Sequence, residues 1–119
     1  MHIKSKTLFV DIDGTLIYHQ NLNLSDQCNV KVLLNGTLEK FTEWDQKGYN
    51  IILTTGRRES MRKKTQEQLT ELGLFWDQLI MGIGGGDRVI INDKKPNSDR
   101  STSYAINLTR NKGIQDVEI

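Results

Sequence analysis

Residues Thr7–Thr15 read TLFVDIDGT, an apolar run that ends in two aspartates and a glycine. A continuous apolar run of this length predicts a short buried strand over residues 7–12. Buried strands of this kind are typical of parallel sheets that helices cover. Gly14 permits the sharp turn that would end the strand. The stretch therefore predicts an α/β protein whose first strand carries Asp11 and Asp13 to the carboxyl edge of a sheet.

The rest of the chain alternates predicted helices and strands. Helices are expected over residues 37–47, with Thr37 as the N-cap, and over residues 59–72. Further strands are expected over four short stretches: residues 49–54, 77–81, 88–91 and 103–108. This order predicts a mostly parallel sheet flanked by helices.

Length and composition narrow the class of protein. The chain has 119 residues without an evident linker or repeat, so we expect one domain over residues 1–119. The net charge of +1 argues against a nucleic-acid partner, and the single cysteine, Cys28, excludes an internal disulfide. No apolar stretch approaches the roughly 18 residues of a membrane span. We therefore expect a cytoplasmic enzyme or binding module with no membrane partner.

Polar residues follow three of the predicted strands: residues 11–15, residues 54–57, and the pair Asn92-Asp93. Open parallel sheets place their sites beyond the carboxyl ends of the strands, so these residues should meet at one edge. Asp11 and Asp13 are two residues apart, which sends both carboxylates to the same side of an extended backbone. Two carboxylates this close repel each other and require a cation or a shared proton. Oxygen ligands favour a hard divalent ion, and Mg²⁺ when a phosphate is bound.

Three sequence stretches resemble motifs of the haloacid dehalogenase superfamily of phosphohydrolases. These are DIDGT at residues 11–15, IILTTGR at residues 51–57 and VIIND at residues 89–93, which occur in the order and at the spacing of that superfamily. The resemblance covers nearly the whole chain, although Asn92 takes the first place of the acidic pair in the last motif. It implies the minimal superfamily core: a three-layer α/β sandwich with a mostly parallel, Rossmann-like sheet and no cap domain. Without a cap the site would be open, and a macromolecular substrate or a homo-oligomer could cover it.

The resemblance also implies an activity, namely magnesium-dependent hydrolysis of a small phosphate monoester. Asp11 would attack phosphorus to form an aspartyl-phosphate, and Asp13 would protonate the leaving oxygen and then activate water. Mg²⁺ would be held by Asp11, by Asp13 through its backbone carbonyl, and by Asp93, while Thr55 and the Gly56 amide would bind a phosphoryl oxygen. A sugar phosphate is the substrate class that the resemblance favours. A non-catalytic phosphate-binding module and a phosphotransferase of the same superfamily are the alternatives.

One part of the superfamily pattern is missing. A lysine, sometimes an arginine, usually lies a few residues before the last motif, but here residues 84–86 are glycines. Arg88 is one substitute for this phosphate-binding cation, provided that the glycine run folds back over the site. The basic residues from Arg57 to Lys64 are interpreted mainly as a solvated helix face. The other candidate cations are Lys63, Lys64, Lys94 and Lys95.

Overall fold

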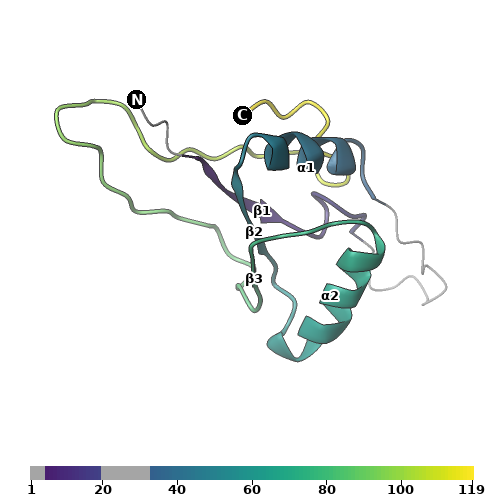
Figure 1. The fold of residues 1–119 in the computed structure, drawn as a ribbon. Coiled ribbons are helices and arrows are strands. Elements are labelled where there is room, and N and C mark those ends of the chain that lie inside the picture. Colours follow the sequence, from purple (N-terminus) through teal and green to yellow (C-terminus); the bar gives the residue numbers. More distant parts are fainter. Residues whose placement is uncertain (1–4, 20–32) are drawn as a thin grey trace.

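The computed structural model describes residues 5–19 and 33–119, so Cys28 lies outside the described residues. Its elements in chain order are β1 (Thr7–Asp11), α1 (Thr37–Gln46), β2 (Asn50–Thr54), the 3₁₀ turn η1 (Glu59–Met61), α2 (Arg62–Glu71) and β3 (Gln78–Ile80) (Figure 1). Strand β2 lies between β1 and β3, and both strand pairs are parallel. The chain therefore has the α/β fold that the sequence predicts. None of the helices in the described ranges is long and apolar enough to cross a membrane.

One face of the sheet carries the hydrophobic core. The register places Leu8 beside Ile51, Val10 beside Leu53, and Leu53 beside Leu79, and all five side chains are buried. The same cluster contains three further buried side chains from the two helices: Phe41 and Trp44 of α1 and Leu69 of α2. Both helices thus cover the same face, because the strand period of two sends these alternate residues toward them.

The opposite face of the sheet is open. Phe9 of β1 is 57% exposed, although its register partner on β2, Ile52, is buried. Ile80 at the end of β3 is 39% exposed. Across residues 5–19 and 33–119 the elements form two layers, one of strands and one of helices, so the third layer of the expected sandwich is not confirmed.

The last two predicted strands are wrong for the described chain. Residues 88–91 and 103–108 form no strand, and residues 84–108 instead make a long excursion from β3, here called the arm (Figure 1). Ile91 is 93% exposed and Val89 is 79% exposed. A strand requires a neighbouring backbone to pair with, and the arm has no such partner in this arrangement. The apolar residues of these two stretches give them strand propensity, but the sequence pattern does not determine a pairing partner.

The start of α1 differs in one detail from the sequence prediction. Gly36, not Thr37, is the N-cap, and its φ of 85° lies in the left-handed region. A Cβ on Gly36 would lie 2.4 Å from the Cα of Gln115, so this position has no room for a side chain. The Thr37 hydroxyl is buried and donates to the carbonyl oxygens of Leu16 and Leu34 at 3.0 and 2.9 Å. Thr37 therefore ties the helix to the loop that follows β1.

The chain returns to the core after the arm, through residues 110–117. The Asn111 N–H donates to the Gly14 carbonyl at 2.8 Å, and the Ile114 N–H donates to the Asn35 carbonyl at 2.9 Å. Ile114 is buried with 2% of its surface exposed. This segment therefore holds the loop after β1 through Gly14 and the residues before α1 through Asn35.

Candidate active site

Four of the predicted site residues follow neighbouring strands at one edge of the sheet. Asp11 ends β1 directly beside Thr54, which ends β2, and Asp13 lies two residues after Asp11. Thr55 follows at once, and its N–H donates to the carbonyl of Ile80 at 3.0 Å. Parallel pairing forces this outcome, because all three strands finish at the same edge. The structure thus brings Asp11, Asp13, Thr55 and the adjoining Gly56 to the carboxyl edge.

The loop after β1 places the two aspartates outside the hydrophobic core. Ile12 between them is completely buried, so it anchors the loop while its neighbours face the edge. The Gly14 N–H donates to the Ile17 carbonyl at 2.8 Å, and the φ of Gly14 is 89°. This left-handed conformation is accessible to glycine at no steric cost, which explains the glycine in the motif. The loop is therefore a fixed turn.

The Asp11 carboxyl has a raised pKa. Burial among protein atoms is the largest cause, although the residue as a whole is still open to solvent. The Thr15 hydroxyl, which donates to Oδ2 at 3.3 Å, lowers the pKa, while the negative charge of Asp13 raises it. A backbone hydrogen bond from Ile12 and the positive charge of Arg88 lower it less. The ionised carboxylate is thus costly in the protein alone, and a cation beside it would relieve that cost.

Asp13 forms a bidentate ion pair with Arg57, a residue that the sequence placed at the site edge without assigning it a role. Arg57 Nε donates to Asp13 Oδ2 at 3.0 Å, and Nη2 donates to Oδ1 at 2.7 Å. Nη1 of the same guanidinium donates to Thr65 Oγ1 at 3.1 Å and to Gln68 Oε1 at 2.8 Å, both on α2. The interpretation of Arg57 as part of a solvated face is therefore wrong. Its position after β2 predicted that it lies at the edge, but no signal in the sequence predicted the pairing with Asp13.

Thr55 and Gly56 offer donors at the edge. Thr55 is 1% exposed, and its Oγ1 accepts the N–H of Arg57 at 3.1 Å, which leaves the hydroxyl proton to donate elsewhere. A Cβ on Gly56 would lie 3.0 Å from the carbonyl oxygen of Ile83, which is a tight contact. Within the described residues the Gly56 N–H has no hydrogen-bond partner. This pair can therefore bind an anionic oxygen.

The glycine run folds back over the strand ends. The Gly82 N–H donates to the Arg57 carbonyl at 2.8 Å, and the Ile83 N–H donates to the Thr55 carbonyl at 3.0 Å. Nη1 of Arg88 then donates to the carbonyls of Gly84 and Gly86. The charge of Arg88 reaches Asp11, whose pKa it lowers. The start of the glycine run thus lies against the residues that follow β2, and the role of Arg88 as the phosphate-binding cation stays a prediction.

Asp93 is not brought to the other two aspartates. It lies on the exposed arm, where its carbonyl accepts the Thr102 hydroxyl at 2.7 Å. Asn92 Nδ2 donates to the same hydroxyl oxygen at 3.1 Å. Among residues 5–19 and 33–119, no group of three or more His, Cys, Asp or Glu side chains could hold a metal. The expectation for Asp93 as a third ligand is not met here, because the strand that would carry it is not part of the sheet.

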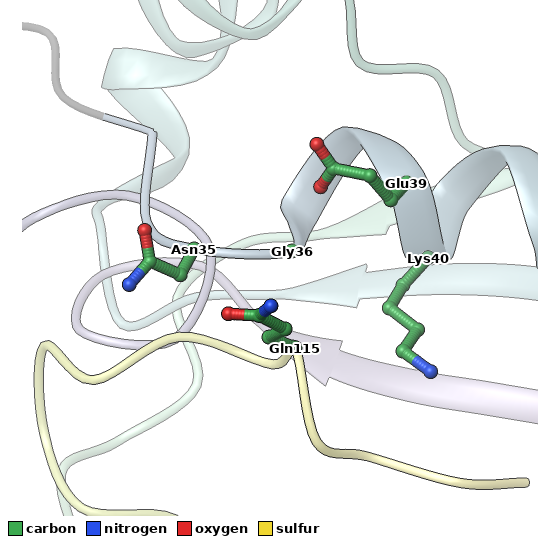
Figure 2. A pocket seen from close by; sticks show the side chains of 5 residues that line it. All are labelled: Asn35, Gly36, Glu39, Lys40 and Gln115. Carbon is green, nitrogen blue, oxygen red and sulfur yellow. The ribbon is translucent and has the colours of Figure 1, made fainter.

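Two hollows lie beside the two helices. The first, of about 380 Å³, is at the start of α1 and is lined by Asn35, Gly36, Glu39, Lys40 and Gln115 (Figure 2). The second, of about 280 Å³, runs along α2 and is lined by Arg57, Met61, Lys64, Glu67, Gln68 and Glu71. Neither hollow is lined by Asp11 or Asp13; Asp11 is exposed and Asp13 is half-buried. A ligand there would be bound by charge and hydrogen bonds more than by enclosure.

No family model and no curated protein matches the sequence. A chain of the Pnkp1/Rnl/Hen1 complex is 27% identical to it with a TM-score of 0.52, over 71% of this chain and 30% of that chain. A structural-genomics protein from Vibrio cholerae is 26% identical with a TM-score of 0.49, over 73% of this chain and 79% of that chain. The chain thus spans less than a third of the similar chain from the complex. That similarity agrees with an α/β fold.

Proposed function

We propose that the chain hydrolyses phosphate monoesters through an aspartyl-phosphate intermediate on Asp11. The observation that carries this proposal is the placement of Asp11 and Asp13 beside the donors of Thr55 and Gly56 at one sheet edge. The two neighbouring carboxyl groups can act as nucleophile and acid, and the donors beside them can bind the phosphoryl oxygens. The motif resemblance to haloacid dehalogenase phosphohydrolases supports the same reaction. A sugar phosphate is the substrate class that this resemblance favours.

Two displacements at phosphorus make up the reaction. An Asp11 carboxylate oxygen attacks phosphorus, the ester P–O bond breaks, and the leaving oxygen takes a proton from Asp13. For this step one Asp13 oxygen carries the proton and gives up its contact with Arg57, while the other oxygen keeps its contact. Water then attacks the same phosphorus and gives its proton to Asp13, while the bond from Asp11 to phosphorus breaks. Inorganic phosphate leaves, and both aspartates return to their starting states. Dividing the hydrolysis in this way replaces one difficult step by two easier ones.

Donors around the edge would hold the phosphoryl group. The Thr55 hydroxyl and the Gly56 N–H would each donate to a phosphoryl oxygen. Arg88 would supply the cation that the glycine run lacks, because its charge already reaches Asp11. Such donors accelerate the reaction when they are fixed in place before charge develops. The hydrogen bonds that hold residues 55–57 against Ile80, Gly82 and Ile83 meet that condition.

Magnesium fits the oxygen atoms that are present. Mg²⁺ in proteins commonly binds one or two carboxylates and completes its shell with water and substrate phosphate. Asp11 would contribute its carboxylate and Asp13 its backbone carbonyl, since the Asp13 carboxylate is already paired with Arg57. The ion would neutralise negative charge on the phosphate and on Asp11. The raised pKa of Asp11 supports a cation at this point.

The proposal includes the three-layer core of the superfamily. The open sheet face around Phe9 is where a further layer would pack, and the apolar residues 89–91 of the arm have strand propensity. A non-catalytic phosphate-binding module is the second candidate, favoured by the missing lysine and by the position of Asp93. It would keep the anion seat of Thr55 and Gly56 without turnover.

Phosphate release from purified protein tests the function. An aryl phosphate and a sugar phosphate are each incubated with Mg²⁺, with and without excess chelator, and Asp11→Asn serves as the control for contaminating phosphatases. We expect Mg²⁺-dependent release from the native chain and none from Asp11→Asn. Adding an acceptor alcohol distinguishes a phosphotransferase, which would divert product from inorganic phosphate. Absence of turnover, together with calorimetric binding of inorganic phosphate, would favour the binding module.

A further inference from the structure

The guanidinium of Arg57 is almost fully used by the protein itself. An arginine side chain has five N–H donors in a planar fork. Within the described residues, the contacts to Asp13 take one donor of Nε and one of Nη2, while those to Thr65 and Gln68 occupy both donors of Nη1. One N–H on Nη2 is left over. A group bound in this way is poorly suited to capture a substrate phosphate, which arginine grips best with two parallel donors.

The same contacts leave Asp13 a single orientation. Both of its carboxylate oxygens meet the fork, at 3.0 and 2.7 Å, which restrains rotation about both side-chain bonds. The pair is partly shielded from water, with 23% of the Arg57 side chain and 27% of the Asp13 side chain exposed. Partial shielding makes the geometry harder to break than that of a fully exposed pair. Asp13 is therefore held by its partner, and not by its own rotamer preference alone.

Arg57 is itself fixed from two sides. Its N–H donates to Thr55 Oγ1 at 3.1 Å, so its backbone is held by the proposed phosphate seat. Its Nη1 is held by Gln68 and by Thr65, the latter completely buried on α2. A continuous chain of contacts thus runs from the second helix through Arg57 to Asp13. Each link is a hydrogen bond with a fixed direction.

We propose that Arg57 is a positioning residue for Asp13, and that α2 fixes the orientation of the Arg57 guanidinium through Thr65 and Gln68. This inference rests on the proposed function, because it assigns Asp13 the task of protonating the leaving oxygen. Arg57 holds the carboxyl group where the leaving oxygen departs, and it does not bind the phosphate. Misplacing an acid by about 1 Å can cost on the order of 100-fold in rate. The loss should be largest for esters whose leaving oxygen needs the acid, because the water step that Asp13 also serves is common to all esters.

The test compares two esters with different leaving groups. An aryl phosphate leaves readily without a proton, whereas an alkyl phosphate depends on one. We expect Arg57→Ala to lower kcat for the alkyl ester by roughly 10- to 100-fold, with a smaller loss for the aryl ester that reflects only the shared water step, and with KM nearly constant. Gln68→Ala should lower kcat in the same pattern by a smaller factor. This variant keeps the test possible if Arg57→Ala folds poorly. Arg57→Lys keeps the positive charge but lacks the two parallel N–H donors, so it should recover little of the alkyl ester turnover.

The matched control is Arg62→Ala. Arg62 also forms a bidentate pair with a carboxylate, Glu59, at 2.6 and 3.1 Å, but it serves neither aspartate. Both rates should stay close to native in this variant. A double variant, Asp13→Asn with Arg57→Ala, should be no slower than Asp13→Asn alone, because residues that act as a unit are not additive. Added guanidinium ion should partly restore alkyl phosphate turnover in Arg57→Ala only.

Three results would overturn the inference. An equal rise of KM for both esters in Arg57→Ala would make Arg57 a phosphate ligand, and multiplied losses in the double variant would make the two residues independent. In both cases the native chain still hydrolyses the esters, so the proposed function stands. If the native chain hydrolyses neither ester, the proposed function fails and the role of Arg57 falls with it.

Discussion

The side-chain oxygen of Asn111 accepts the backbone N–H of His19 at 2.8 Å, although the two residues are 92 positions apart. The Asn111 backbone N–H donates in turn to the Gly14 carbonyl, also at 2.8 Å. Asn111, which follows the arm, thus contacts both Gly14 in the turn after the aspartates and His19 farther along the chain. The loop that carries Asp13 is therefore fixed by a distant part of the chain.

Asn111→Ala should loosen this loop. The change removes the acceptor for His19 and places alanine at a φ of 65°, a conformation that asparagine tolerates better. We expect a loss of about 1–2 kcal/mol in the free energy of unfolding, measured by denaturant titration. Asn111→Asp keeps the acceptor and the tolerance for positive φ, and it should stay closer to native. Equal losses in both variants would mean that the contact with His19 carries no stability.

Asp11→Asn should stabilise the metal-free protein at neutral pH. Because the pKa of Asp11 is raised, the folded state binds this proton more tightly than the unfolded chain does. The contribution of Asp11 to stability is thus present at low pH and is lost as pH rises through the raised pKa. The variant removes that cost, so we expect Tm at pH 7 to rise by about 2 °C, a small shift because the residue is exposed.

The gain from Asp11→Asn should vanish below the ordinary aspartate pKa of 3.8, where the native carboxyl is neutral in both states. Thermal unfolding in chelator at both pH values measures the difference. Asp99→Asn, an exposed carboxylate on the arm, is the control for net charge. A gain that persists unchanged at low pH would contradict the electrostatic origin.

Arg88→Ala should lower phosphatase turnover, because we propose Arg88 as the cation that neutralises the phosphate, and its charge acts weakly on Asp11 already. We expect kcat to fall by roughly 10²–10³-fold, the size of losing one charge-stabilising donor, with little change in Tm. Lys94 and Lys95 lie farther along the exposed arm. We therefore expect Lys94→Ala and Lys95→Ala to keep kcat within about twofold of the native value. A comparable loss in either lysine variant would transfer the role to that lysine.

Asp93→Asn decides whether the arm contributes to metal binding. In the structure Asp93 is exposed and apart from Asp11 and Asp13, so the Mg²⁺ concentration that gives half-maximal turnover should change by less than about twofold. Loss of a true ligand would instead weaken the metal strongly, by at least the 10- to 100-fold that is typical for a supporting residue. Such a loss would show that the arm carries Asp93 to the aspartates during turnover. Substitution of Mn²⁺ should preserve activity, and Ca²⁺ should inhibit it.

Much of the secondary structure follows from local signals. The apolar run before Asp11 predicted β1, and the polar residues after it predicted where the strand ends. Helices α1 and α2 end close to Gly48 and Gly73, whose φ values of 73° and 88° suit the left-handed end of a helix. Each of these features depends on neighbours in the sequence. The prediction that the ends of these strands meet at one edge then followed from the parallel pairing.

The sequence by itself therefore determined the aspartate loop, the strand–helix order and the edge where Asp11, Asp13, Thr55 and Gly56 meet. Tertiary structure alone decided two other matters: the pairing of Arg57 with Asp13, across 44 positions, and the course of the arm. An arginine in a basic stretch gives no local sign of its partner. An apolar stretch such as residues 89–91 becomes a strand only where another backbone accepts its hydrogen bonds, and that depends on the folded neighbours.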